Sequence, residues 1–135
     1  MLKIASKALE EMIEYCKKGF PNEACGYLSG KNGMATKAYD VQNARKDPSS
    51  YEMLPAAQIV AQKLWRKIGL EEMAIYHSHV ATEAVPSRRD IDRATAVQDF
   101  FDGHYVIVTL KDSVPRARAF KIRDGNVTEE ELVES

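Results

Sequence analysis

The first apolar pattern in the chain has helical spacing. Its members fall three or four residues apart and so share one helix face: Leu9, Met12, Ile13 and Cys16. Ser6 precedes them in the position of an N-cap, and Gly19 followed by Pro21 prevents the helix from continuing. The sequence therefore predicts a helix from about residue 6 to residue 19.

Strands are predicted where short apolar runs end at turn residues. They cover residues 24–28, 34–41, 51–53, 73–76, 105–110 and 117–122, with a last strand near Val127. The turn at residues 31–33 joins the first two strands into a hairpin, and Asp124-Gly125 turns the chain before the last one. Residues 73–76 lead directly into His77, and we expect them to form a buried central strand.

Two further helices are predicted. Pro55 suits a first helical position, because its missing N–H would be unpaired there, and Gly69 ends that helix. Its apolar residues form one stripe that we expect to face the core: Ala57, Val60, Ala61, Leu64, Trp65 and Ile68. A third helix is expected from Arg88 to about Phe100. This order of elements indicates an α/β or α+β fold, with a mixed sheet sandwiched by helices.

Length and composition narrow the class of protein. The 135 residues show no compositional break, so we expect residues 1–135 to form one domain. A hydrophobic content of 44% and a charged content of 29% are typical of globular proteins. The net charge of −1 provides no overall attraction to nucleic acid or an anionic membrane, and neither is expected as a partner. Two cysteines and the lack of a signal-peptide pattern favour a cytoplasmic location.

His77 and His79 are candidate metal ligands. Side chains alternate along a strand, so residues two apart point to the same face and their imidazoles can converge. Asp90 follows in the first turn of the third helix. Two nitrogens and one carboxylate oxygen suit a catalytic zinc ion that keeps a fourth position open. The alternative interpretation is an ordinary pair of polar histidines at a strand end.

Ser87 and Asp90 also fit a purely structural role. A serine at the N-cap with an acid three residues later resembles a capping box, and the helix dipole favours the acid there. The two roles are compatible, since residues three apart share one helix face.

The pattern Pro-Asn-Glu-Ala-Cys-Gly at residues 21–26, His-Ser-His at 77–79, Ser87 and Asp90 resembles the JAMM (MPN-plus) metalloproteases, in their small bacterial and archaeal form. The likeness covers roughly residues 5 to 130. It implies a cytidine-deaminase-like MPN fold in which His77, His79 and Asp90 bind Zn²⁺.

The resemblance also implies roles and substrates. Glu23 would be the general acid/base and Ser87 would hydrogen-bond the tetrahedral intermediate, although Glu83 is a rival base by proximity in sequence. The expected reaction is cleavage of a peptide or isopeptide bond at the C-terminus of a ubiquitin-like or sulfur-carrier protein. Where the family carries proline after the second histidine, this chain has Val80, for which we expect altered substrate fit rather than lost metal.

Other interpretations fit the sequence less well. A catalytically silent MPN scaffold that only binds partners would typically lack a metal ligand. A zinc deaminase would need a Cys-x-x-Cys pair, which this chain lacks. Five arginines could form a solvated surface, or bind an acidic surface or a C-terminal carboxylate: Arg88, Arg89, Arg93, Arg116 and Arg118. The oligomeric state stays open, a homodimer included.

Overall fold

The computed structural model describes residues 1–135. Its helices are α1 (Ser6–Gly19), α2 (Pro55–Lys67) and α3 (Arg88–Ala96). Its strands are β1 (Leu2–Ile4), β2 (Cys25–Lys31), β3 (Met34–Val41), β4 (Glu71–His79), β5 (His104–Thr109), β6 (Arg116–Arg123), β7 (Asn126–Glu130) and β8 (Leu132–Glu134). None of the three helices combines the length and the apolar character needed to span a bilayer.

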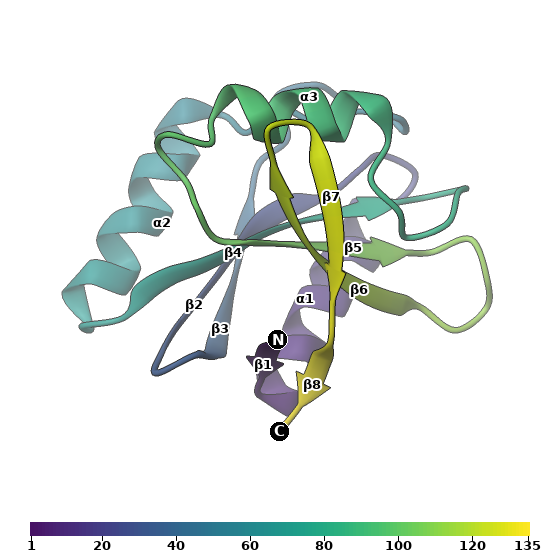
Figure 1. The fold of residues 1–135 in the computed structure, drawn as a ribbon. Helices are drawn as coiled ribbons and strands as arrows, with labels where there is room; N and C mark the ends of the chain where they lie inside the picture. The colour runs from purple at the N-terminus through teal and green to yellow at the C-terminus, as the bar shows by residue number, and fades with distance from the viewer.

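The eight strands form one mixed sheet in the order β7-β6-β5-β4-β2-β3-β1-β8. The central strand β4 pairs antiparallel with β2 and parallel with β5. β7 and β8 lie at opposite ends of this order, yet only Glu131 separates them in the chain. The sheet therefore curls until its two ends approach each other, and the last two strands run on from one another in Figure 1.

Helices cover both faces of the sheet (Figure 1). α1 packs against the concave face, where the largest fully buried side chains of the cluster include Leu2, Ile4, Met12, Leu28, Tyr76, Val106 and Val108. On the other face, α2 covers a cluster around Trp65 and α3 covers a cluster around Ile107. The expected mixed sheet between helices is confirmed, and β4 runs under the space between α2 and α3.

The predicted helices are confirmed, with shifted ends. Ala5 occupies the N-cap of α1, so Ser6 is the first helical residue and its side chain does not cap the helix. α3 ends at Ala96 rather than near Phe100. Beyond it the chain turns so that the Phe101 ring can pack edge-on against Tyr105, with ring centroids 5.4 Å apart.

The apolar stripe of α2 is only partly buried, and the prediction was wrong for half of its members. Val60, Leu64 and Ile68 are 58%, 51% and 55% exposed, whereas Trp65 is buried. The Trp65 ring rests edge-on against two tyrosine rings of the sheet, and this contact fills the space beneath the helix. The stripe is thus wider than the surface that α2 covers.

Several strand predictions also need correction. β1 and β8 were not predicted, because each has three residues and its partner lies far away in the sequence. Residues 51–53 form no strand, only an isolated bridge between Asn43 and Met53. β2 continues past the expected end to Lys31 through an irregularity in pairing at Ser29 and Gly30.

Candidate metal centre

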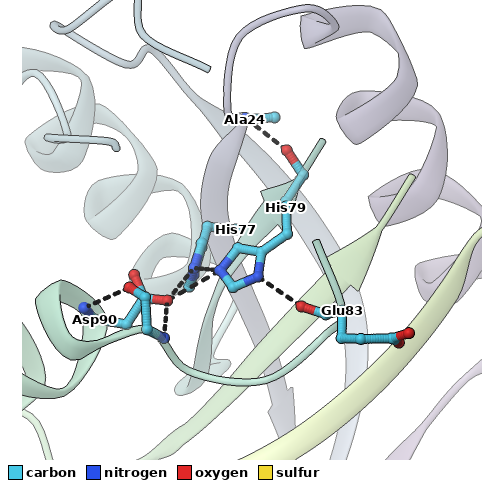
Figure 2. A network of polar contacts seen from close by, with 7 residues as sticks. Ala24, His77, His79, Glu83 and Asp90 are labelled. Carbon is cyan, nitrogen blue, oxygen red and sulfur yellow. Dashed lines mark hydrogen bonds and ion pairs between the residues drawn. The ribbon is translucent and has the colours of Figure 1, made fainter. Parts of the chain in front are cut away.

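His77, His79 and Asp90 converge in the space between β4 and α3 (Figure 2). The two histidines project from the same face of β4, because they are two residues apart in a strand. His77 Nε2 lies 3.1 Å from His79 Nε2, and Asp90 Oδ2 lies 3.1 Å and 3.0 Å from these two atoms. The histidines are 2% and 5% exposed, so water provides little solvation for the three groups.

The chemistry of these atoms indicates a cation site. His79 Nδ1 must donate to the Glu83 carbonyl oxygen 2.8 Å away, because a carbonyl can only accept. In a neutral imidazole this leaves a lone pair on His79 Nε2, facing a carboxylate oxygen that is also an acceptor. Converging acceptors repel one another unless a proton or a metal cation lies between them.

Burial and pairing set the charges of the three groups. Burial raises the pKa of Asp90, but hydrogen bonds from His77 and His79 outweigh it and hold the pKa well below its usual range. Burial lowers the pKa of His77, which favours the neutral imidazole that binds metals. Burial also opposes a charge on His79, but hydrogen bonds to Asp90 and to the Glu83 carbonyl outweigh it and raise the pKa of His79, so a metal ion would displace a proton there. An ionised aspartate and a neutral histidine are the protonation states that a metal site requires.

Asp90 is held in place by the start of α3. Its backbone N–H donates to Ser87 Oγ at 3.1 Å, and its Oδ2 accepts from the Ser87 N–H at 2.9 Å, which together form a capping box. The structural and metal-binding interpretations of these residues therefore hold together. The Ser87 hydroxyl accepts in this arrangement, and its own hydrogen has no acceptor within the chain.

Glu23 lies in the segment between α1 and β2, which is tied to its surroundings by main-chain hydrogen bonds. The Glu23 N–H donates to the Asp47 carbonyl at 2.9 Å, and Asn43 Nδ2 donates to the Glu23 carbonyl at 3.0 Å. The next residue, Ala24, donates its N–H to Ser78 Oγ at 2.8 Å (Figure 2). The Ser78 N–H donates in turn to the Ala24 carbonyl at 3.0 Å. Ser78 stands between the two histidines, so two hydrogen bonds link the Glu23 segment to the ligand strand.

The Glu23 carboxyl group is buried, 5% exposed, and its Oε1 has no hydrogen-bond partner. Burial raises the pKa of Glu23 to about 7, although the positive charges of His79 and Arg93 oppose this rise. A carboxyl group with this pKa can both take up and release a proton near neutral pH.

Glu83, the rival base by sequence proximity, faces another way. Its backbone carbonyl holds His79, but its side chain is 60% exposed and pairs with Lys111 at 3.0 Å. Figure 2 shows this carboxylate directed away from the histidines.

Two further side chains extend the site: Tyr51, for which the sequence suggested no role, and Arg93, one of the five arginines considered for binding an acidic group. The Tyr51 ring stacks on His77 with centroids 4.7 Å apart, and Arg93 Cζ lies 4.2 Å from the centre of the Tyr51 ring. Arg93 follows Asp90 by three residues, so the two share one helix face. No local pattern distinguishes Tyr51, which comes from a loop.

The five arginines singled out in the sequence have three kinds of surroundings. Arg88, Arg116 and Arg118 form surface ion pairs with acids on their own or a neighbouring element. Arg89 is exposed. Of the five, Arg93 alone is stacked against a residue of the candidate metal centre.

Residues 5–123 match the family described as prokaryotic homologs of the JAB domain. The chain is 35% identical over 136 residues to the CysO-cysteine peptidase of Mycobacterium tuberculosis, covering 96% of this chain and 88% of that protein. It is 33% identical over 87 residues to a probable TtuB-protein conjugate cleaving protease of Thermus thermophilus, covering 64% and 58%. A solution structure of a Desulfitobacterium hafniense protein, 33% identical, superposes with a TM-score of 0.88 and covers 100% of this chain and 93% of that one.

Proposed function

The chain belongs to the family of prokaryotic JAB-domain proteins, and we propose that it is a zinc-dependent peptidase. Its expected substrate is a ubiquitin-like or sulfur-carrier protein, cut at a peptide or isopeptide bond at the carrier's C-terminus. The observation that carries the proposal is the convergence of three buried acceptor atoms from His77, His79 and Asp90, close to the buried carboxyl group of Glu23.

The three ligand atoms fit zinc. A tetrahedral site with bonds of about 2.0–2.1 Å has edges of about 3.3 Å. The observed separations of 3.0–3.1 Å are a few tenths of an ångström shorter. Small movements of the three side chains would therefore give the spacing that zinc requires. Two imidazole nitrogens and one carboxylate oxygen leave one position open, as in catalytic zinc sites. Bound there, zinc would supply Lewis acidity that polarises a carbonyl and acidifies water.

Glu23 is proposed as the general acid/base. Its carboxylate takes a proton from the water that attacks the carbonyl carbon, and passes that proton to the leaving nitrogen as the C–N bond breaks. The products are a carboxylate on the carrier and a free amine. Such proton transfer contributes about 100- to 10,000-fold to rate, and the pKa of Glu23, about 7, suits both directions.

Ser87 is proposed to stabilise the oxyanion of the tetrahedral intermediate. Its hydroxyl oxygen accepts from the Asp90 N–H while the hydroxyl hydrogen remains free to donate. A single donor to an oxyanion is commonly worth about 3 kcal/mol of barrier. The capping box supports this role, because it fixes the serine next to a metal ligand.

The substrate class is proposed from the relatives. One is named as a peptidase for CysO-cysteine and another as a protease that cleaves TtuB-protein conjugates. The second candidate, a catalytically silent scaffold, is disfavoured because all the ligand atoms and a buried carboxyl group are present together.

Metal analysis and hydrolysis together test the proposal. The native protein should bind about one zinc ion per chain, and Asp90→Ala should lose it. Glu23→Gln should keep the metal and lose at least about 100-fold in hydrolysis, whereas Glu83→Gln, the matched control, should keep both. A native protein that takes up no zinc at neutral pH, or a Glu23→Gln protein with the full rate, would contradict the proposal.

A further inference from the structure

The side-chain amide of Asn43 makes four hydrogen bonds to the segments around the candidate metal centre. We propose that Asn43 is a positioning residue for the reaction, because it holds the backbone of Glu23 and the loop that stacks Tyr51 on His77. Asn43 is not among the site residues that the sequence indicates. The inference rests on the proposed function, in which Glu23 is the acid/base.

Both polar atoms of the Asn43 amide are used twice. Asn43 Nδ2 donates to the Glu23 carbonyl at 3.0 Å and to the Ser50 carbonyl at 3.2 Å. Asn43 Oδ1 accepts from the Arg45 N–H at 2.9 Å and from the Glu52 N–H at 3.0 Å. An amide group has two N–H donors and one oxygen with two lone pairs, so these four bonds use its full capacity.

Two of these bonds bracket Tyr51 in the chain. The Ser50 carbonyl and the Glu52 N–H belong to the residues on either side of Tyr51, so Asn43 fixes the backbone before and after it. The Tyr51 ring is buried and stacks on His77, with ring centroids 4.7 Å apart and an angle of 29° between the planes. Asn43 therefore helps to determine where the ring against the His77 imidazole lies.

The same loop holds Glu23 on both sides of its backbone. The Glu23 N–H donates to the Asp47 carbonyl at 2.9 Å, and the Glu23 carbonyl accepts from Asn43. The carboxyl oxygen Oε1 of Glu23 is buried without a hydrogen-bond partner, so it provides no anchor of its own. The place of this carboxyl group thus depends on the backbone that carries it.

The chemistry of the four bonds requires an amide of this length. An aspartate at position 43 keeps the two acceptor bonds, but its second oxygen faces the carbonyls of Glu23 and Ser50, which are also acceptors. Alanine makes none of the four bonds. The connection between the Glu23 segment and the Tyr51 loop therefore runs through the two donors of one NH₂ group.

The test is Asn43→Asp in the zinc-loaded protein. The substrate is a ubiquitin-like carrier with a fluorescent amine joined to its C-terminus by an amide bond. The variant should keep about one zinc ion per chain and a KM within about 2-fold of the native value. Its kcat should fall by about 10- to 100-fold, because a catalytic group that is displaced by about 1 Å can lose about 100-fold in rate.

Gln98→Glu is the matched control, because it exchanges an amide for a carboxylate in another part of the chain. Gln98 Nε2 donates to Asp124 Oδ1 and Gln98 Oε1 accepts from the Asp124 N–H, both at 2.8 Å, between the end of α3 and the β6–β7 turn. This control also loses a donor that joins two segments, but neither segment carries Glu23 or Tyr51. Its kcat should equal that of the native protein.

The His77 ring-proton NMR signal gives a second readout that needs no turnover. In chelator-treated protein at pH 8, where the lowered pKa of His77 keeps the imidazole neutral, the stacked Tyr51 ring shifts this signal by its ring current. Asn43→Asp should move the signal and Gln98→Glu should not. The native protein offers a measurement without any variant: the Asn43 NH₂ protons should exchange with solvent at least about 10-fold more slowly than those of the exposed Asn126.

The outcomes separate this inference from the proposed function. A kcat of Asn43→Asp within about 2-fold of the native value, an equal fall in Gln98→Glu, or an unchanged His77 signal overturns the inference and leaves the peptidase proposal standing. If the native protein cuts no carrier amide, the peptidase proposal fails, and the His77 signal decides whether Asn43 holds the site. If Asn43→Asp does not fold, equal exchange rates for Asn43 and Asn126 in the native protein overturn the inference and slow exchange at Asn43 supports it.

Discussion

The hydrogen bond between Ser78 and Ala24 offers a sharp test of how the site is held together. Ser78 lies between the two histidines and is fully buried, and its hydroxyl accepts from the Ala24 N–H at 2.8 Å. Its own N–H donates to the Ala24 carbonyl at 3.0 Å. Ser78→Ala removes the first bond and keeps the second, so the segment that carries Glu23 loses one of its attachments to β4.

The magnitude follows from what the alanine leaves behind. A buried N–H without an acceptor costs about 1–3 kcal/mol of folding stability. The Glu23 segment keeps its bonds to Asn43 and Asp47, so we expect it to shift rather than unfold. A shift of about 1 Å in a catalytic group can cost about 100-fold in rate, and we expect kcat to fall by about 10- to 100-fold.

Urea unfolding followed by the fluorescence of the single tryptophan, Trp65, measures the stability. Ser29→Ala is the matched control, because Ser29 is also fully buried and its hydroxyl donates to Tyr39 at 2.9 Å on the neighbouring strand. Both variants should lose stability and keep zinc, but only Ser78→Ala should lose kcat. An equal loss of kcat in both variants would refute the idea that this bond positions Glu23.

Three further predictions follow from other parts of the structure. Burial raises the pKa of Glu23 from 4.5 to about 7. In chelator-treated protein the stability that goes with the protonated carboxyl group is therefore complete below pH about 4.5 and lost as the pH rises through about 7. Urea unfolding should show Glu23→Gln to be more stable than the native protein at pH 8, by up to about 3 kcal/mol, and equal to it at pH 4. Val80→Pro should keep the zinc content and the melting temperature, because the Val80 N–H makes no hydrogen bond that proline would remove. A sharp rise in zinc affinity of this variant, measured by titration, would contradict the prediction. Gly26→Ala should destabilise the fold by at least about 3 kcal/mol, seen as a lower urea midpoint or lost soluble protein, because the added Cβ would lie 1.9 Å from the Tyr39 carbonyl oxygen and 2.5 Å from the Tyr76 hydroxyl.

The parts of the structure that the sequence predicts are those encoded by neighbouring residues. The β2–β3 hairpin follows from a turn in which Asn32 and Gly33 both take positive φ values of 55° and 78°. His77 and His79 share a face because strand side chains alternate, and Asp90 reaches them from a helix start that Ser87 caps. Each of these is a local rule that needs no knowledge of the rest of the fold.

The parts that the sequence does not predict depend on distant segments. The half-exposed state of Val60 and Leu64 depends on what lies beneath α2, and an apolar stripe does not encode that. Tyr51 approaches His77 across 26 positions of sequence, from a loop without any period. The sequence singles out Arg93 but not its contact with Tyr51, which lies 42 positions away.

The pairing of β1 with β8 bears on the order in which the chain folds. Leu2 pairs with Leu132, so about 130 residues must be synthesised between the two partners of this parallel contact. Closing a loop of that length from an unfolded chain costs about 4 kcal/mol in lost conformational entropy. The three residue pairs of the β1–β8 contact stabilise the chain by less than this cost. The contact should therefore form last, after the other strands have brought the two ends of the sheet together. Until β8 leaves the ribosome, β1 presents an unpaired edge to neighbouring nascent chains.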